Sequence, residues 1–191
     1  MLTVDYFGRF FTRDGFDFGG LLDADFFEPV RILFQAKHFV SATKLLMVAI
    51  DSLSHIEYGD TQGGFIRWLN VYAELSKLGI TSDELWEHRN SLLHMSNLDS
   101  RKVQSGKVRR LMIYVGDLPS EVALGDASTG YFSLQGLIFE FAAACGRWVE
   151  TYNNDRSKID VFVRRYDLIA SDARMLWVKV DTDTSQETTS K

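Results

Sequence analysis

Cysteine and long apolar runs are scarce in this chain of 191 residues. The single cysteine, Cys145, excludes an intramolecular disulfide framework and is typical of a protein from a reducing compartment. It stands among alanines and phenylalanine, where we interpret it as a small buried residue rather than a nucleophile. The sequence does not open on a basic segment followed by an apolar run, and charged residues interrupt its apolar stretches before they reach membrane-spanning length. We therefore expect a cytoplasmic protein that spans no membrane.

Positive charge is also in short supply, because the formal net charge is -5. Any contact with nucleic acid must then be local. The densest basic segment lies between Asp99 and Asp117 and contains no acidic residue. It is either a solvated face or a surface that binds RNA phosphates. In the second case the phosphate contacts would be Lys102, Lys107, Arg109 and Arg110.

Signals for a metal or a cofactor are missing as well. No glycine loop has the spacing that cradles phosphates, and cysteines do not cluster. None of the 4 histidines has a glutamate three positions before it, which the metal sites of helical bundles require. The sequence thus predicts neither a metal site nor a cofactor.

The hydrophobic content of 46% is sufficient for one domain with its own core. Residues 1–23 are rich in phenylalanine and glycine and show no helical period, which predicts an irregular arm or short strands. The rings of this arm either pack on the domain or reach a second subunit. Residues 24–180 form the predicted helical domain. Residues 181–191 contain no apolar side chain and are expected to be disordered.

Apolar periodicity within the domain predicts a mainly α fold, an up-and-down helical bundle with room for one short β element. A helix over 26–56 is expected to be long and central, because its second half is apolar around most of its circumference. Residues 116–130 are expected to form a loop, and 111–115 either a strand or a short buried helix. The other predicted helices cover residues 65–78, about 82–96, 131–152 and 158–169.

The helix predicted from about residue 82 carries the most informative stretch of the chain. Its start combines Thr81 with Glu84 at capping-box spacing, although Ser82 is an alternative cap. Arg89 falls inside the apolar arc of this helix, and a guanidinium aimed inward needs an acid, a phosphate or water at its end. Asp51 interrupts the apolar run of the central helix and is the natural buried partner of Arg89, unless it faces solvent at the helix edge.

The hexapeptide Arg89-Asn90-Ser91-Leu92-Leu93-His94 resembles the R-x4-6-H motif of the HEPN superfamily, the higher eukaryotes and prokaryotes nucleotide-binding domains. The resemblance implies a homodimer and metal-independent cleavage of RNA, in which the ribose 2′-hydroxyl attacks the adjacent phosphate. His94 would act as general base or acid, Arg89 would hold the phosphate, and Asn90 would orient the phosphate or the histidine. Such proteins are often toxins or antivirus effectors that a cognate antitoxin or regulatory protein restrains.

Two other interpretations of the hexapeptide remain. Arg89 can serve as the internal partner of an acid while His94 completes the end of the helix, where positive charge suits the dipole. A dimeric HEPN-like module that binds nucleotide, nucleic acid or protein without catalysis is the alternative function. Geometry discriminates between these interpretations, since residues five apart point about 140° from each other in an ideal helix. A shared site therefore requires the helix to bend or end between Arg89 and His94, or the cleft to wrap around that edge of the helix.

Overall fold

The computed structural model describes residues 8–95, 100–118 and 127–174, and these residues are mainly helical. The predicted tail over 181–191 lies outside them. The longer helices are α2 (Glu28–Gln35), α3 (Phe39–Tyr58), α4 (Gly64–Tyr72), α5 (Ser82–Asn90), α8 (Leu134–Asn154) and α9 (Lys158–Arg174). The shorter helical segments are α1 (Phe18–Leu22), α6 (Arg101–Gln104), and the turns Gly8–Phe10, Asp23–Phe27, Leu75–Leu78 and Ser91–Met95.

Helix α3 forms the centre of the bundle and contacts α2, α4, α8 and α9. Leu46, Ile50 and Leu53 are fully buried on it, because its apolar residues recur around most of the circumference. By length and composition α3 would also suit a membrane span, but half of that stretch is buried by the other helices. It is therefore the core helix that the sequence predicts.

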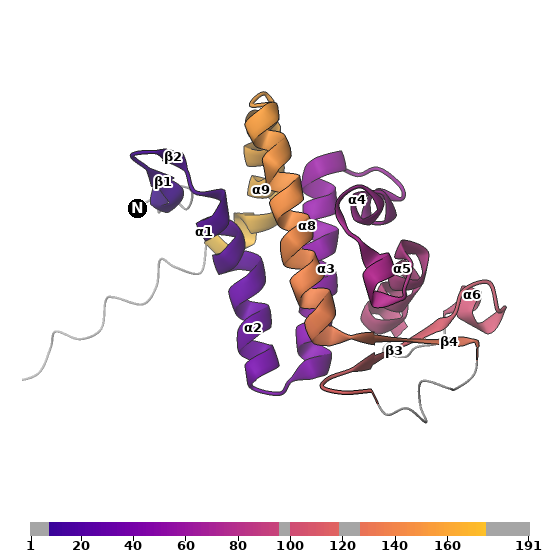
Figure 1. Ribbon diagram of the computed structural model, residues 1–191. Helices are drawn as coiled ribbons and strands as arrows, with labels where there is room; N and C mark the ends of the chain where they lie inside the picture. Colours follow the sequence, from indigo (N-terminus) through magenta and orange to yellow (C-terminus); the bar gives the residue numbers. More distant parts are fainter. Residues whose placement is uncertain (1–7, 96–99, 119–126, 175–191) are drawn as a thin grey trace, which may run out of the picture.

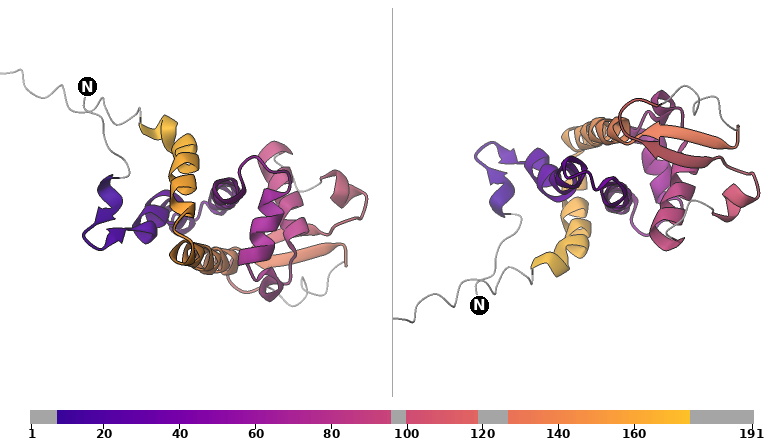
Figure 2. Two further views of the ribbon diagram at one scale, coloured as in Figure 1. Left: turned by 90° about the horizontal axis from the view of Figure 1, so that it is seen from above. Right: turned by 90° about the horizontal axis from the view of Figure 1, so that it is seen from below.

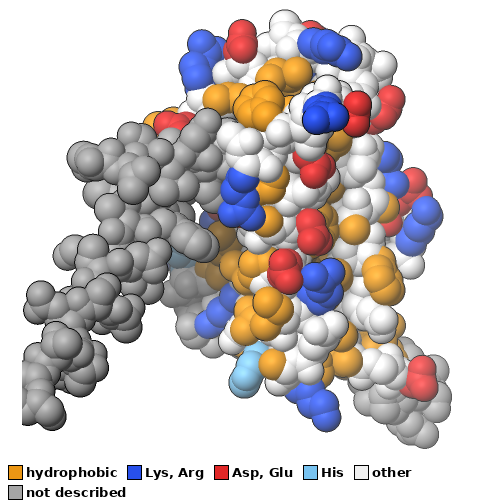
Figure 3. Space-filling view, turned by 90° about the vertical axis from the view of Figure 1, so that its left-hand side faces the viewer, with side chains coloured by type: hydrophobic (Ala, Val, Ile, Leu, Met, Phe, Trp, Pro, Cys, Tyr) orange, Lys and Arg blue, Asp and Glu red, His pale blue; other side chains and the backbone are white. Residues whose placement is uncertain are grey.

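The helices around α3 do not all follow its direction. Helices α2, α3 and α8 run along a common axis, whereas α5 and α9 lie across it (Figures 1 and 2). The face that α1 and α2 present carries hydrophobic and charged side chains of both signs interspersed (Figure 3). The bundle thus combines helices that share one axis with others that cross it.

The single long helix expected over 26–56 is wrong, because the chain reverses between α2 and α3 (Figure 1). Lys37 adopts a φ of 63°, in the left-handed region. The amide of His38 donates to the carbonyl of Leu33 and that of Lys37 to the carbonyl of Phe34. These two bonds form a Schellman motif, which ends α2 with a lysine where glycine is usual.

The described part of the N-terminal arm, residues 8–23, packs on the domain. Strands β1 (Phe11–Thr12) and β2 (Gly15–Phe16) form a short antiparallel hairpin. The rings of Phe16 and Phe18 both lie against Phe162 of α9, with centroids 6.3 and 5.1 Å apart. Helix α1 is a correction to the expected irregular arm: Asp17 caps it by accepting from the amide of Gly20.

A second small sheet lies beneath α5. Strand β3 (Arg110–Tyr114) is one of the two alternatives expected for this segment, and it pairs in parallel with β4 (Thr129–Ser133). The loop expected through residue 130 is therefore wrong at its end, because Thr129 and Gly130 belong to a strand. Helix α8 accordingly begins at Leu134, where the side chain of Ser133 accepts from the amide of Gly136.

Candidate functional site

Helix α5 has a fixed beginning. The side chain of Thr81 accepts from the amide of Glu84, and the carboxylate of Glu84 accepts in return from the amide of Thr81. This is the capping box that the sequence predicts, with Thr81 rather than Ser82 as the cap. This cap fixes where α5 begins and therefore the direction in which each later side chain of the helix points.

The end of α5 widens into a π-helical turn over Ser91–Met95. Hydrogen bonds in such a turn join residues five apart instead of four, so the fifth residue comes to lie over the first. Arg89 and His94 have this spacing. The turn therefore supplies the bend between Arg89 and His94 that an ideal helix lacks. Turns of this kind occur frequently at functional sites.

Arg89 is the hub of a four-residue cluster. One of its terminal nitrogens, Nη1, lies 3.0 Å from His94 Nε2 and donates to Asn90 Oδ1 at 3.0 Å. The other nitrogen, Nη2, donates to Asp51 Oδ2 at 2.5 Å. The structure thus brings together Arg89, His94, Asn90 and Asp51, the three residues of the motif and the acid of the central helix.

The members of this cluster differ in exposure. The side chain of Arg89 is only 14% exposed, that of Asp51 is 39% exposed, and His94 is an exposed residue. The guanidinium also lies over the ring of Trp86, with its central carbon 5.1 Å from the ring centroid. The guanidinium of Arg89 is thus largely shielded from water, whereas its neighbours His94 and Asp51 are more exposed. The electrostatic attraction between Arg89 and an incoming anion would therefore be stronger here than in bulk water.

The contact with Arg89 determines the form of His94. A guanidinium has donors only, so Nε2 of His94 must be the acceptor. In that arrangement the ring carries its hydrogen on Nδ1. Because Arg89 occupies the lone pair of Nε2, His94 can take a proton from a hydroxyl group only once a bound phosphate has drawn Arg89 away from it.

The opposite side of α5 packs against the small sheet and has a structural role. Burial lowers the pKa of His88 to about 4, with a smaller opposite effect from the backbone of Leu111. The His88 ring meets Phe132 of β4 edge-on, with centroids 5.6 Å apart. His88 is therefore a neutral core residue, and its position next to Arg89 in the sequence does not place it in the cluster.

Two of the four basic residues predicted to bind RNA form ion pairs with acidic residues of α5. Arg109 donates to both oxygens of the buried Glu84, and Lys102 Nζ lies 2.9 Å from a carboxylate oxygen of the buried Glu87. Burial would raise the pKa of Glu84, but the hydrogen bonds from Arg109 and Thr81 outweigh it and lower that pKa. Sequence reasoning treated the basic segment as one surface and missed these partners, which lie far away in the chain.

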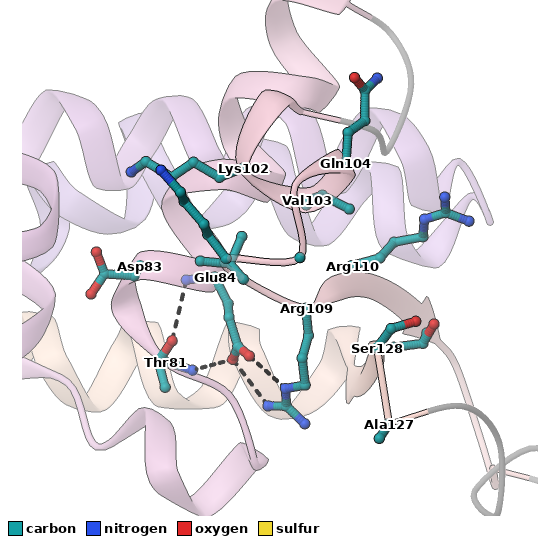
Figure 4. A pocket seen from close by; sticks show the side chains of 14 residues that line it. Thr81, Asp83, Glu84, Lys102, Val103, Gln104, Arg109, Arg110, Ala127 and Ser128 are labelled. Atoms are coloured by element: carbon teal, nitrogen blue, oxygen red, sulfur yellow. Dashed lines mark hydrogen bonds and ion pairs between the residues drawn. The ribbon is translucent and has the colours of Figure 1, made fainter.

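The same basic residues line a cavity of about 850 Å³ between the start of α5, α6 and the small sheet. In Figure 4 Arg109 turns toward Glu84, whereas Arg110 points away from that pair. Lys107 is an exposed residue of the same lining. The structure thus divides the predicted RNA-binding residues into a structural pair, Lys102 and Arg109, and an outward pair, Lys107 and Arg110.

Neither Cys145 nor a group of metal-binding side chains adds to the site. Burial raises the pKa of the Cys145 thiol, which keeps it protonated inside α8. Within residues 8–95, 100–118 and 127–174, no three His, Cys, Asp or Glu side chains gather as a metal would need.

We compared the chain with protein-family models, with curated proteins and with solved structures. Nothing matches. The geometry of the Arg89 cluster and the motif that it contains are thus the features that point to a function.

Proposed function

We propose that this protein is a metal-independent endoribonuclease of the HEPN type that cleaves single-stranded RNA. The observation that carries the proposal is the 3.0 Å contact between Arg89 Nη1 and His94 Nε2. A permanent cation for the phosphate and an imidazole for the proton of the 2′-hydroxyl, placed side by side, are the two groups that cleavage through the ribose 2′-hydroxyl needs. The resemblance of the hexapeptide to the R-x4-6-H motif supports the same chemistry.

In this proposal each member of the cluster has a role that follows from its contacts. His94 takes the proton of the 2′-hydroxyl as that oxygen attacks the adjacent phosphorus. The 5′-oxygen of the next nucleotide leaves with the electron pair of the broken bond and takes a proton from water to become a 5′-hydroxyl. Arg89 stabilises the additional negative charge on the phosphate oxygens in the transition state. Asn90 accepts from Arg89 and is thus a positioning residue. The phosphates on either side would be bound by Lys107 and Arg110, and the protein would act as a homodimeric toxin or antivirus effector.

The ion pair between Asp51 and Arg89 opposes the binding of a phosphate to Arg89. Its carboxylate already neutralises Arg89, so an RNA phosphate must share or replace that partner. The exposed fraction of 39% leaves the Asp51 side chain room to turn toward solvent when an anion arrives. The free enzyme then keeps its catalytic arginine paired, which avoids an unpaired buried cation.

The test is cleavage of a single-stranded RNA by purified protein in excess chelator. His94→Ala removes the acid–base group and is expected to lower the rate by about 10²- to 10⁴-fold. His38→Ala is the matched control, because His38 is an exposed histidine at the start of α3, and it should cut at the parental rate. Arg89→Lys keeps the charge and loses the planar fork, and we expect a loss of rate; its melting temperature, measured beside the rate, separates lost stability from lost chemistry.

One observation favours the second candidate, a dimeric HEPN-like module without catalysis. Both terminal nitrogens of Arg89 have partners inside the protein, as a purely structural arginine would. The two candidates differ in the same assay. If the chelated parent cuts no RNA, or if His94→Ala cuts as fast as the parent, the non-catalytic module is the better account.

A further inference from the structure

A second cavity adjoins the Arg89 cluster on the side of α3. Its volume is about 560 Å³, and it lies between the second half of α3, the loop from Gly59 to Gly64, Trp86 of α5 and the end of α9. Asp51 belongs both to the wall of this cavity and to the ion pair with Arg89. Trp86 likewise lines the cavity and lies beneath the guanidinium. A group bound here would therefore be next to a phosphate held by Arg89.

The charged side chains that line the cavity disfavour a phosphate in its interior. The described residues that line it include two carboxylates, Asp51 and Asp60, but no lysine or arginine. His55 is the other titratable side chain of the lining, and its Nδ1 lies 3.3 Å from Asp60 Oδ1. An uncharged group is thus favoured over an anion inside, while the anion remains at the edge beside Arg89.

The walls of the cavity suit a flat ring. Trp86 is half-buried and packs against Phe65, with ring centroids 5.3 Å apart and planes inclined by 50°. At the end of α9, Leu168 is 71% exposed and Ile169 is 38% exposed. Single-stranded nucleic acid is commonly bound by stacking its bases on such aromatic side chains.

Two polar side chains of the cavity, Asp51 and Asp60, are carboxylates, which only accept hydrogen bonds. The hydroxyls of Ser54 and Thr61 already donate to backbone carbonyls. Asp51 engages Arg89 through Oδ2 only, which leaves Oδ1 as an acceptor. The carboxylate of Asp60 is 98% exposed at the mouth of the cavity. Guanine is the RNA base whose Watson–Crick edge presents both a ring N–H and an amino group, and a carboxylate can accept from both of them.

We propose that this cavity is a guanine-binding subsite, in which the base next to the scissile phosphate stacks on Trp86 and donates to the carboxylates of Asp51 and Asp60. The subsite rests on the proposed ribonuclease function, and it adds a preference for cleavage beside guanosine. It also gives Asp51 two roles, as partner of Arg89 and as acceptor for the base.

The test is calorimetric titration of the protein with three nucleotides, guanosine, inosine and cytidine 3′-monophosphate. Inosine lacks only the amino group of guanosine. We expect guanosine 3′-monophosphate to bind about tenfold more tightly than either of the others, because a hydrogen bond to a charged group is lost in each case.

Variants separate stacking from hydrogen bonding. Trp86→Leu should weaken binding of guanosine 3′-monophosphate by about 5- to 100-fold, whereas Trp86→Phe keeps an aromatic ring and should retain most of it. Asp60→Asn should remove most of the preference for guanosine over inosine. Phe139→Leu changes an aromatic side chain that is 64% exposed on α8, outside the cavity, and should bind like the parent.

The outcomes separate the subsite from the nuclease. Equal affinity for the three nucleotides, or binding to Trp86→Leu and Trp86→Phe that equals the parent's, overturns the subsite. If RNA is cut in a His94-dependent way without a preference for guanosine, the subsite is wrong and the nuclease stands. If guanosine 3′-monophosphate binds as expected while RNA is not cut, the nuclease is wrong and the cavity binds a nucleotide for another purpose.

Discussion

Protonation of His88 is expected to make the stability of the protein depend on pH. Burial lowers the pKa of His88 from 6.5 to about 4 in the folded state, so the unfolded chain binds a proton there more readily. Stability from this residue is therefore fully present above pH 6.5 and is lost as the pH falls toward 4. The full shift corresponds to about 3 kcal/mol, of which about 2 kcal/mol is lost between pH 7.5 and 5.0.

Urea unfolding of the parent and of His88→Gln at pH 7.5 and 5.0 measures this contribution. Carboxylates such as Glu84 also titrate toward acid pH, but they do so in both proteins. The free energy of unfolding of the parent should thus fall by about 2 kcal/mol more than that of the variant. His38→Gln, at an exposed position, should keep the parental slope. Equal slopes for the parent and His88→Gln would refute the burial argument.

Three further predictions concern stability and assembly. Asp51→Ala leaves the desolvated Arg89 without its carboxylate partner and should lower the free energy of unfolding by about 1–3 kcal/mol. Asp60→Ala should change the free energy of unfolding little. Equal melting temperatures of the two variants would show that the ion pair adds no stability. Lys37→Gly removes the strain of a left-handed backbone, which costs roughly 1–2 kcal/mol, but glycine loses about 0.5–1 kcal/mol more backbone entropy on folding. We therefore expect a small rise in the urea midpoint, and a fall would contradict the proposed strain at Lys37. Light scattering at micromolar concentration should give the mass of a dimer with the motif helices near the twofold axis, and a monomer mass would count against a composite site.

Local signals in the sequence account for much of the fold. The capping pair Thr81 and Glu84 marks the start of α5. Asp51 stands out because a carboxylate inside an apolar run needs a partner, and Arg89 is the inward cation that meets it. These features could be predicted because each depends on spacing within one segment or on one uncompensated charge. The helix predicted over 65–78 is wrong in its second half, because α4 ends at Tyr72 and a separate helical turn over Leu75–Leu78 ends at Gly79 in the left-handed region.

The features that the sequence did not reveal depend on unusual backbone or on distant partners. Lys37 occupies a helix-ending position where glycine would have given a signal. Strand β4 is stabilised by parallel pairing with β3, which no local period announces. The π-helical turn leaves no mark in side-chain type, although it decides whether Arg89 and His94 meet. Lys102 and Arg109 read as a basic surface because their acid partners lie on another helix.

The most direct test of cleavage by Arg89 and His94 is the chemistry of the product ends. An RNA cut in excess chelator should leave a 2′,3′-cyclic phosphate and a 5′-hydroxyl, identified by mass spectrometry, because the 2′-hydroxyl is the nucleophile. The same RNA with a single deoxyribose at the cut nucleotide should resist cleavage there. Products with a 3′-hydroxyl, or cleavage at the deoxyribose, would contradict the mechanism.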